Sequence, residues 1–184
     1  MLTFVVQVAD RPGVLNRIAS LLRRRGFNID SLTVGHTDAA GISRMTVVVE
    51  ANAEAAPRIE ANLYKLVHVR RVENVTEVAT VCRDLALVKV ATSVESRSQV
   101  MQLVDVFRAR IVDVAPESLI IEITGTEEKV DGLVEMLRPF GVIEMARTGR
   151  LAMARGRPVA GRPETAPPVG ATPTAGDESI ACSV

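Results

Sequence analysis

The chain has 184 residues, of which 47% are hydrophobic and 24% charged, and its 22 basic residues balance 22 acidic ones. This composition is that of a folded globular protein and excludes an intrinsically disordered chain. Nucleic-acid binding is disfavoured, because no surplus of positive charge is present to hold phosphates and the chain has no Trp, one Tyr and four Phe on which bases could stack.

Two further features bear on the compartment of the protein. The N-terminal stretch Leu2–Val8 has no basic segment before it and is too short to span a bilayer. We therefore expect a cytoplasmic protein. Cys82 and Cys182 are far apart in the chain, which indicates neither a disulfide framework nor a metal site.

The first half of the chain predicts four strands and two helices from apolar periodicity and turn residues. In chain order these are a strand over Leu2–Val8, a helix from Val14 that ends at Gly26, strands over Ile29–Val34 and Met45–Val49, a helix over Ala55–Leu66 and a strand over Val67–Val72. The turn residues Asp38–Gly41 join the middle two strands as a hairpin. The predicted order is βαββαβ.

The same order recurs in the second half. It predicts a strand over Leu85–Ala91, a helical stripe over Val100–Phe107, strands over Ile111–Val114 and Leu119–Ile123, a helix over Val130–Leu137 and a strand over Val142–Ala146. Pro139 is expected to end the last helix. The fold class is thus α+β, with two ferredoxin-like domains whose helices cover one face of each sheet and leave the other face uncovered. Such small sheets bury little surface alone, which favours a homodimer.

The predicted domains are residues 1–79 and 80–155, followed by a tail over 156–184. Pro, Gly, Ala and Thr dominate this tail, and large apolar residues that would offset the entropy of ordering are scarce. We expect it to be disordered.

The most informative motif lies where the first strand ends and the first helix begins. It reads Asp10, Arg11, Pro12, Gly13, Val14 and Leu15. Free N–H groups and the helix dipole at such a point favour a carboxylate, and a glycine lets it approach the backbone. Asp10 could accept a hydrogen bond from an ammonium group. The alternative is that Asp10 only caps the helix and Gly13 only eases a turn.

These motifs resemble those of a known family. Asp10–Leu15 resembles the signature loop of ACT domains, which bind amino acids and regulate metabolic enzymes. Further segments resemble, more specifically, the acetolactate synthase small subunit family. These segments are Arg25–Gly35, Ser43–Thr46, Leu85–Val90, Phe107–Ala109, Asp113–Ser118, Pro139–Gly141 and Ala146–Gly149. The resemblance covers about residues 1 to 156.

The resemblance implies a regulatory subunit in branched-chain amino acid biosynthesis. It would activate a catalytic large subunit and confer feedback inhibition by valine. Thiamine diphosphate, Mg²⁺ and FAD belong to that partner, and no cofactor or catalytic residue is expected in this chain, which shows no GxGxxG or P-loop motif. The effector site would combine the Asp10–Leu15 loop of one chain with Asn28 and Ile29 of its dimer mate.

One alternative function stays open. The chain could be a free-standing ACT sensor that acts on another partner, although the presence of a second domain argues against this. Residues 1–79 are expected to sense the amino acid and residues 84–156 to tune the response, because the second strand-to-helix junction, near Thr92–Arg97, has no Pro-Gly pair. His36 and His68 lack neighbours at metal-ligand spacing and are assigned no site.

Overall fold

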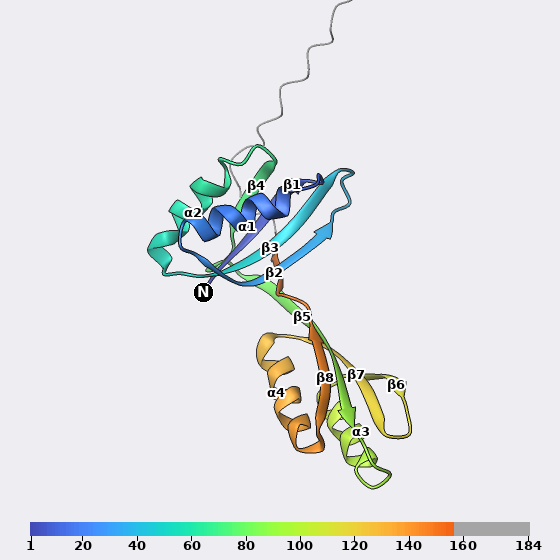
Figure 1. Ribbon diagram of the computed structural model, residues 1–184. Coiled ribbons are helices and arrows are strands. Elements are labelled where there is room, and N and C mark those ends of the chain that lie inside the picture. The colour runs from blue at the N-terminus through green and yellow to red at the C-terminus, as the bar shows by residue number, and fades with distance from the viewer. Residues whose placement is uncertain (157–184) are drawn as a thin grey trace, which may run out of the picture.

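The computed structural model describes residues 1–156, so the predicted tail lies outside the described residues except for Gly156. Two units follow one another along the chain (Figure 1). The first contains β1 (Leu2–Ala9), α1 (Val14–Arg24), β2 (Asn28–His36), β3 (Ile42–Glu50), the 3₁₀ turn η1 (Ala53–Ala55), α2 (Ala56–Leu63) and β4 (Val69–Asn74). Its sheet has the antiparallel strand order β2-β3-β1-β4.

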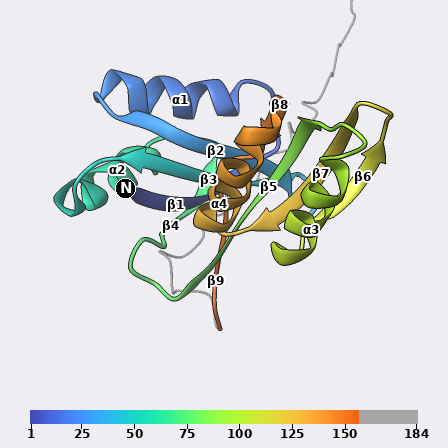
Figure 2. The same ribbon diagram turned by 90° about the horizontal axis from the view of Figure 1, so that it is seen from below.

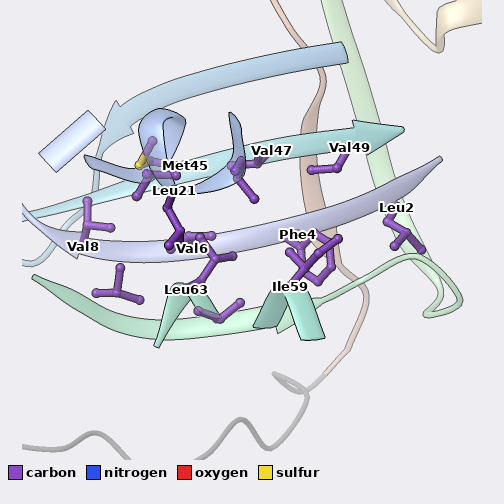
Figure 3. Packing of buried hydrophobic residues seen from close by; sticks show 14 of the residues in the cluster. Leu2, Phe4, Val6, Val8, Leu21, Met45, Val47, Val49, Ile59 and Leu63 are labelled. Carbon is purple, nitrogen blue, oxygen red and sulfur yellow. The ribbon is translucent and has the colours of Figure 1, made fainter. Parts of the chain in front are cut away.

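Side chains along β1 point alternately to the two faces of the sheet, and this alternation explains where the core of the first domain lies. Phe4 and Val6 are fully buried and share one cluster with Leu21 of α1 and Ile59 of α2 (Figure 3). Burying side chains of this size stabilises the fold by about 1.5–3 kcal/mol each. Val5, the residue between them, points to the opposite face and belongs to a separate buried cluster.

The second unit repeats this arrangement. It contains β5 (Thr80–Ala91), α3 (Arg97–Val106), β6 (Arg110–Val114), β7 (Ser118–Gly125), α4 (Glu127–Leu137), the 3₁₀ turn η2 (Arg138–Phe140), β8 (Val142–Arg147) and β9 (Leu151–Ala154). The strand order is β6-β7-β5-β8, and its core includes Val88, Ile121 and Leu133. Helix α4 ends just before Pro139, as proline requires. The prediction of two ferredoxin-like α+β domains is confirmed.

The structure corrects the sequence analysis in one respect, because the first sheet is not bare on its second face. Residues Thr80–Arg83 extend β5 and pair with β9, a strand that was not predicted. In Figure 2, β9 and α1 lie on opposite sides of the first sheet. Ala152 of β9 is fully buried with Val5 and Val75. We call residues Gly149–Ala154 the crossing segment, because they run from the second domain across this face.

Charged residues of the second domain pair with one another where the crossing segment begins. Arg147 forms an ion pair with Asp84, and Arg150 forms an ion pair with Glu127. These four residues line a cavity of about 380 Å³ at the domain junction, together with residues of β2. Among the described helices, none is long and apolar enough to cross a membrane.

Candidate functional site

A tight turn precedes helix α1. Gly13 has φ 82° and ψ −5°, and the Val14 N–H lies 3.4 Å from the Arg11 carbonyl oxygen. These values match the third position of a type II turn, where residues with a Cβ are disfavoured, and Pro12 occupies the second position, which suits its fixed φ. The Pro-Gly pair therefore sets the path by which the chain enters the helix.

The first turn of α1 has no side-chain cap. Gly13 is the N-cap residue, no side chain accepts a hydrogen bond from the helix N–H groups, and the turn contains no acidic residue. The interpretation of Asp10 as a helix cap is therefore wrong. An uncapped N-terminus carries about half a positive charge, which favours an anion from outside.

Open space surrounds this N-terminus. Apart from Gly13 and its two chain neighbours, no heavy atom lies within 4 Å of the position that a Cβ on Gly13 would take. Arg11, Pro12 and Gly13 are exposed, and Leu15 is 46% exposed although it is apolar, whereas Val14 is buried in the core. The loop thus offers free N–H groups and an apolar side chain on one accessible surface.

Asp10 is tied to the hairpin between β2 and β3. Its N–H donates to the Gly41 carbonyl oxygen at 2.8 Å, and its carboxylate lies 3.4 Å from Nδ1 of His36. Half of the Asp10 side chain is exposed, so the carboxylate remains accessible to an ammonium group. His36 is thus a neighbour of the site that sequence analysis missed. The pairing of His36 with Ser43 puts it at this end of the sheet, and only the register of the hairpin could have revealed it.

Asn28 and Ile29 lie at the other end of the same sheet. Asn28 pairs with Glu50 and its side-chain amide donates to the Glu50 carboxylate at 3.5 Å, whereas Asp10 follows the Ala9–Ile42 pair. Eight residues of β3 separate these two ends, or roughly 25 Å at the rise of a strand. Ile29 is half-buried against the core. Within one chain, therefore, the structure does not bring the two predicted halves of the effector site together.

The equivalent junction of the second domain differs from this loop. Two serines exchange hydrogen bonds before α3, since the Ser93 N–H donates to Oγ of Ser96 at 2.9 Å and the Ser96 N–H donates to Oγ of Ser93 at 3.2 Å. These bonds satisfy two donors of the turn, but α3, like α1, has no side-chain cap and no acidic residue in its first turn. The two junctions therefore differ in the turn that precedes the helix, which contains a Pro-Gly pair only in the first domain.

Residues 1–156 contain no group of three or more His, Cys, Asp or Glu side chains that could hold a metal ion. Within the same range Cys82 is a free thiol. The groups that the loop exposes could form hydrogen bonds with an anion at the helix end and with a cation at the nearby Asp10 carboxylate.

Comparison with known proteins identifies the class and then the family. A model described as "AHAS small subunit-like ACT domain" matches residues 4–71, so the first domain is an ACT domain. A second model, described as "Small subunit of acetolactate synthase", matches residues 83–156. The chain belongs to the family of acetolactate synthase small subunits, which are regulatory partners of a catalytic large subunit.

Individual relatives agree with this assignment over nearly their whole length. The acetolactate synthase small subunit of Mycobacterium bovis is 46% identical over 154 residues, which cover 84% of this chain and 92% of the relative. That of Bacillus subtilis is 42% identical over 150 residues, covering 81% and 87%. The crystal structure of the small subunit from Thermotoga maritima matches with a TM-score of 0.80 at 40% identity, covering 85% of this chain and 98% of that one.

Proposed function

We propose that this chain activates the catalytic large subunit of acetolactate synthase and makes it sensitive to feedback inhibition by valine. The uncapped, open N-terminus of α1 beside the Asp10 carboxylate is the observation that carries this proposal. The carboxylate of the amino acid would accept hydrogen bonds from the N–H groups that follow Gly13, and its ammonium group would donate to Asp10. Membership of the small-subunit family supports the choice of partner.

A homodimer would complete this site. β2 is an edge strand of the first sheet, with backbone groups available to pair with another strand. If two copies pair antiparallel along β2, the Asn28 end of one strand lies beside the His36 end of the other. Asn28 and Ile29 of one protomer then approach the Asp10–Leu15 loop of its partner. The separation of the two halves within one chain is the reason why the site needs this second copy.

The regulatory action would follow from different affinities for two states. Valine can inhibit only if it binds the less active state of the complex more tightly than the active one. We assign thiamine diphosphate, Mg²⁺ and FAD to the large subunit, and we place the complex in the cytoplasm. The small subunit then needs to supply only the amino-acid site and the surface that contacts its partner.

The first prediction concerns reconstitution with the large subunit. Adding this chain should raise acetolactate synthase activity, and valine should then inhibit, whereas alanine should bind roughly tenfold more weakly. Valine has two methyl groups more than alanine, each worth about 0.8 kcal/mol when buried. Activity assays with valine, leucine, isoleucine and alanine, together with calorimetry on the free dimer, measure these effects. If a pull-down from native cells recovered a different partner and no thiamine diphosphate enzyme, the free-standing sensor would be the correct function.

The second prediction concerns the end of the chain. A variant that stops after Gly156 should keep both activation and valine inhibition, because residues 157–184 are rich in Pro, Gly, Ala and Thr and contain few large apolar side chains that could pack against either domain. The same reconstitution assay tests it. Failure of the shortened chain to activate its partner would mean that residues beyond 156 form part of the docking surface.

A further inference from the structure

The crossing segment Gly149–Ala154 contacts the first sheet at two separate places. At its start, the Arg150 N–H donates to Oγ of Ser31 at 2.8 Å. Further along, the Ala152 carbonyl oxygen accepts a hydrogen bond from Arg44 at 2.6 Å, and the Ala152 N–H lies 3.4 Å from Oγ1 of Thr46. Residues from the end of the second domain thus bind β2 and β3 of the first.

The fit against β2 is close. A Cβ on Gly149 would lie 2.5 Å from Oγ of Ser31, 2.7 Å from Oγ1 of Thr33 and 3.0 Å from the Leu32 carbonyl oxygen. The two hydroxyl contacts are closer than real Cβ atoms approach, so these side chains would have to shift, and the carbonyl oxygen would have to move by a few tenths of an ångström. A residue larger than glycine would therefore disturb this contact, which lies only two to three residues after Asn28 and Ile29.

The other contact, between Arg44 and the Ala152 carbonyl oxygen, lies near the Asp10 loop. Arg44 pairs with Gly35 of β2, next to His36, and His36 lies against the Asp10 carboxylate. Met153, which is 59% exposed, lines a cavity of about 320 Å³ with His36, Thr37 and Asp38 of the hairpin. Arg44 is partly buried on this face, and burial lowers the pKa of its guanidinium, an effect that Glu73 opposes and Arg71 reinforces.

We propose that the crossing segment is a positioning element of the amino-acid site. Through Gly149 and Arg150 it places the part of β2 that follows Asn28 and Ile29, and through the hydrogen bond between Arg44 and the Ala152 carbonyl oxygen it holds β3 beside the hairpin that carries His36, the neighbour of Asp10. The inference rests on the proposed function, because it assigns a role in that site. It also changes the expected division of labour, since sensing then requires residues 149–154, which belong to the predicted second domain.

The same segment is fixed to the second domain, which makes it a route of communication. Leu151–Ala154 pairs with Thr80–Arg83 of β5, and Arg150 forms its ion pair with Glu127 at the start of α4. A shift of β2 on valine binding therefore moves residues that are hydrogen-bonded to the second domain. Coupling between two sites is reciprocal, so valine binding at the first domain and the conformation of the second domain should affect each other by the same free energy.

The third prediction tests this with Gly149→Ala. The added Cβ should displace the segment from β2 and raise the Kd for valine about fivefold or more, while activation of the large subunit is retained. Gly132→Ala is the control, because it adds the same Cβ in α4 of the second domain, where its nearest contact outside the helix would be the Phe107 ring at 3.3 Å. Calorimetry on the full-length dimer and the reconstitution assay give both readouts, and thermal unfolding confirms that each variant is folded.

A second variant removes an interaction without adding bulk. Ser31→Ala deletes the acceptor of the Arg150 N–H and should weaken valine binding in the same direction, by a smaller factor. If Gly149→Ala and Ser31→Ala both bind valine as the unmodified chain does, the positioning role is wrong and the amino-acid site stands. If the unmodified chain itself binds no valine, the proposed function is wrong, so the two failures are distinguishable.

Discussion

Gly13→Asp is expected to abolish valine inhibition of the reconstituted enzyme and to leave activation largely in place. The new carboxylate would occupy the open space at the N-terminus of α1, where the effector's own carboxylate is proposed to bind. Loss of the interaction with the helix end, up to about 2 kcal/mol, and repulsion between like charges, about 1 kcal/mol at 4 Å in water, together correspond to roughly a hundredfold weaker binding. Calorimetry with valine and assay of the complex measure the two effects.

Backbone strain needs a control of its own, because Gly13 has a positive φ. Gly141→Asp provides it, since Gly141 has φ 94° and lies in the second domain, where a Cβ would make only an ordinary contact at 3.6 Å with Ala91. Gly13→Asp should lose stability of about 1–2 kcal/mol, and Gly141→Asp should lose at least as much, because φ 94° and ψ 91° lie outside the left-handed helical region, but Gly141→Asp should remain inhibited by valine. Undiminished inhibition of Gly13→Asp would place the effector site elsewhere.

The fold of each domain could be predicted because apolar periodicity and turn residues agree along the chain. Val14, Ile18, Leu21 and Leu22 recur at helical spacing and are all buried in α1. The uncovered face of the first sheet was predicted wrongly, although the sequence contained a signal against it. Val47–Val49 is an uninterrupted apolar run, typical of a strand covered on both faces, and all three residues are buried. The pattern shows that something covers this face but does not say what.

Strand β9 could not be predicted from its own residues. Leu151–Ala154 has the sequence Leu-Ala-Met-Ala, in which every residue favours a helix. It is extended because tertiary contacts override propensity: Ala152 is small enough to be buried between Val5 and Val75, and β5 supplies the pairing strand. Neither partner is close to β9 in sequence.

The candidate site could be predicted only in part for a similar reason. The Pro-Gly turn before α1 is a local feature, and its motif indicates both the turn and the free helix end. The contact between Asp10 and His36 depends on the register of β2 against β3, which places residues distant in sequence at one end of the sheet. The central loop of the candidate site could therefore be predicted from the sequence, whereas its neighbours could be identified only from the structure.

The motif Ala146–Gly149 gains a physical explanation from Arg147. Its Nε and Nη2 donate to Oδ2 of Asp84 at 3.0 and 2.6 Å, and its Nη1 donates to Asp131 at 2.7 Å. Burial alone lowers the pKa of Arg147, but the hydrogen bonds and charges of Asp84 and Asp131 outweigh it and raise that pKa. The Asp84 side chain is only 7% exposed, so Arg147 is the partner that makes a buried carboxylate tolerable.

Arg147→Ala should therefore destabilise the second domain by about 3 kcal/mol, because it leaves the buried Asp84 carboxylate unpaired. Urea or thermal unfolding of the full chain measures the loss. Asp131→Ala is the matched control: its side chain is 57% exposed, and removing an exposed partner of the same arginine should cost about 1 kcal/mol or less. Equal losses in the two variants would show that Asp84 does not depend on Arg147.

A second substitution shows whether Arg147→Ala lowers stability by leaving the Asp84 charge unpaired or by removing packing contacts. In the Arg147→Ala background, Asp84→Asn removes the negative charge but keeps the shape of the side chain. If the cost arises from the buried carboxylate, the double variant should be more stable than Arg147→Ala alone, although it carries one more substitution. If the cost arises from the lost contacts of the arginine side chain, Asp84→Asn should give no recovery, and the role of the Arg147–Asp84 pair in holding the second domain together would be refuted.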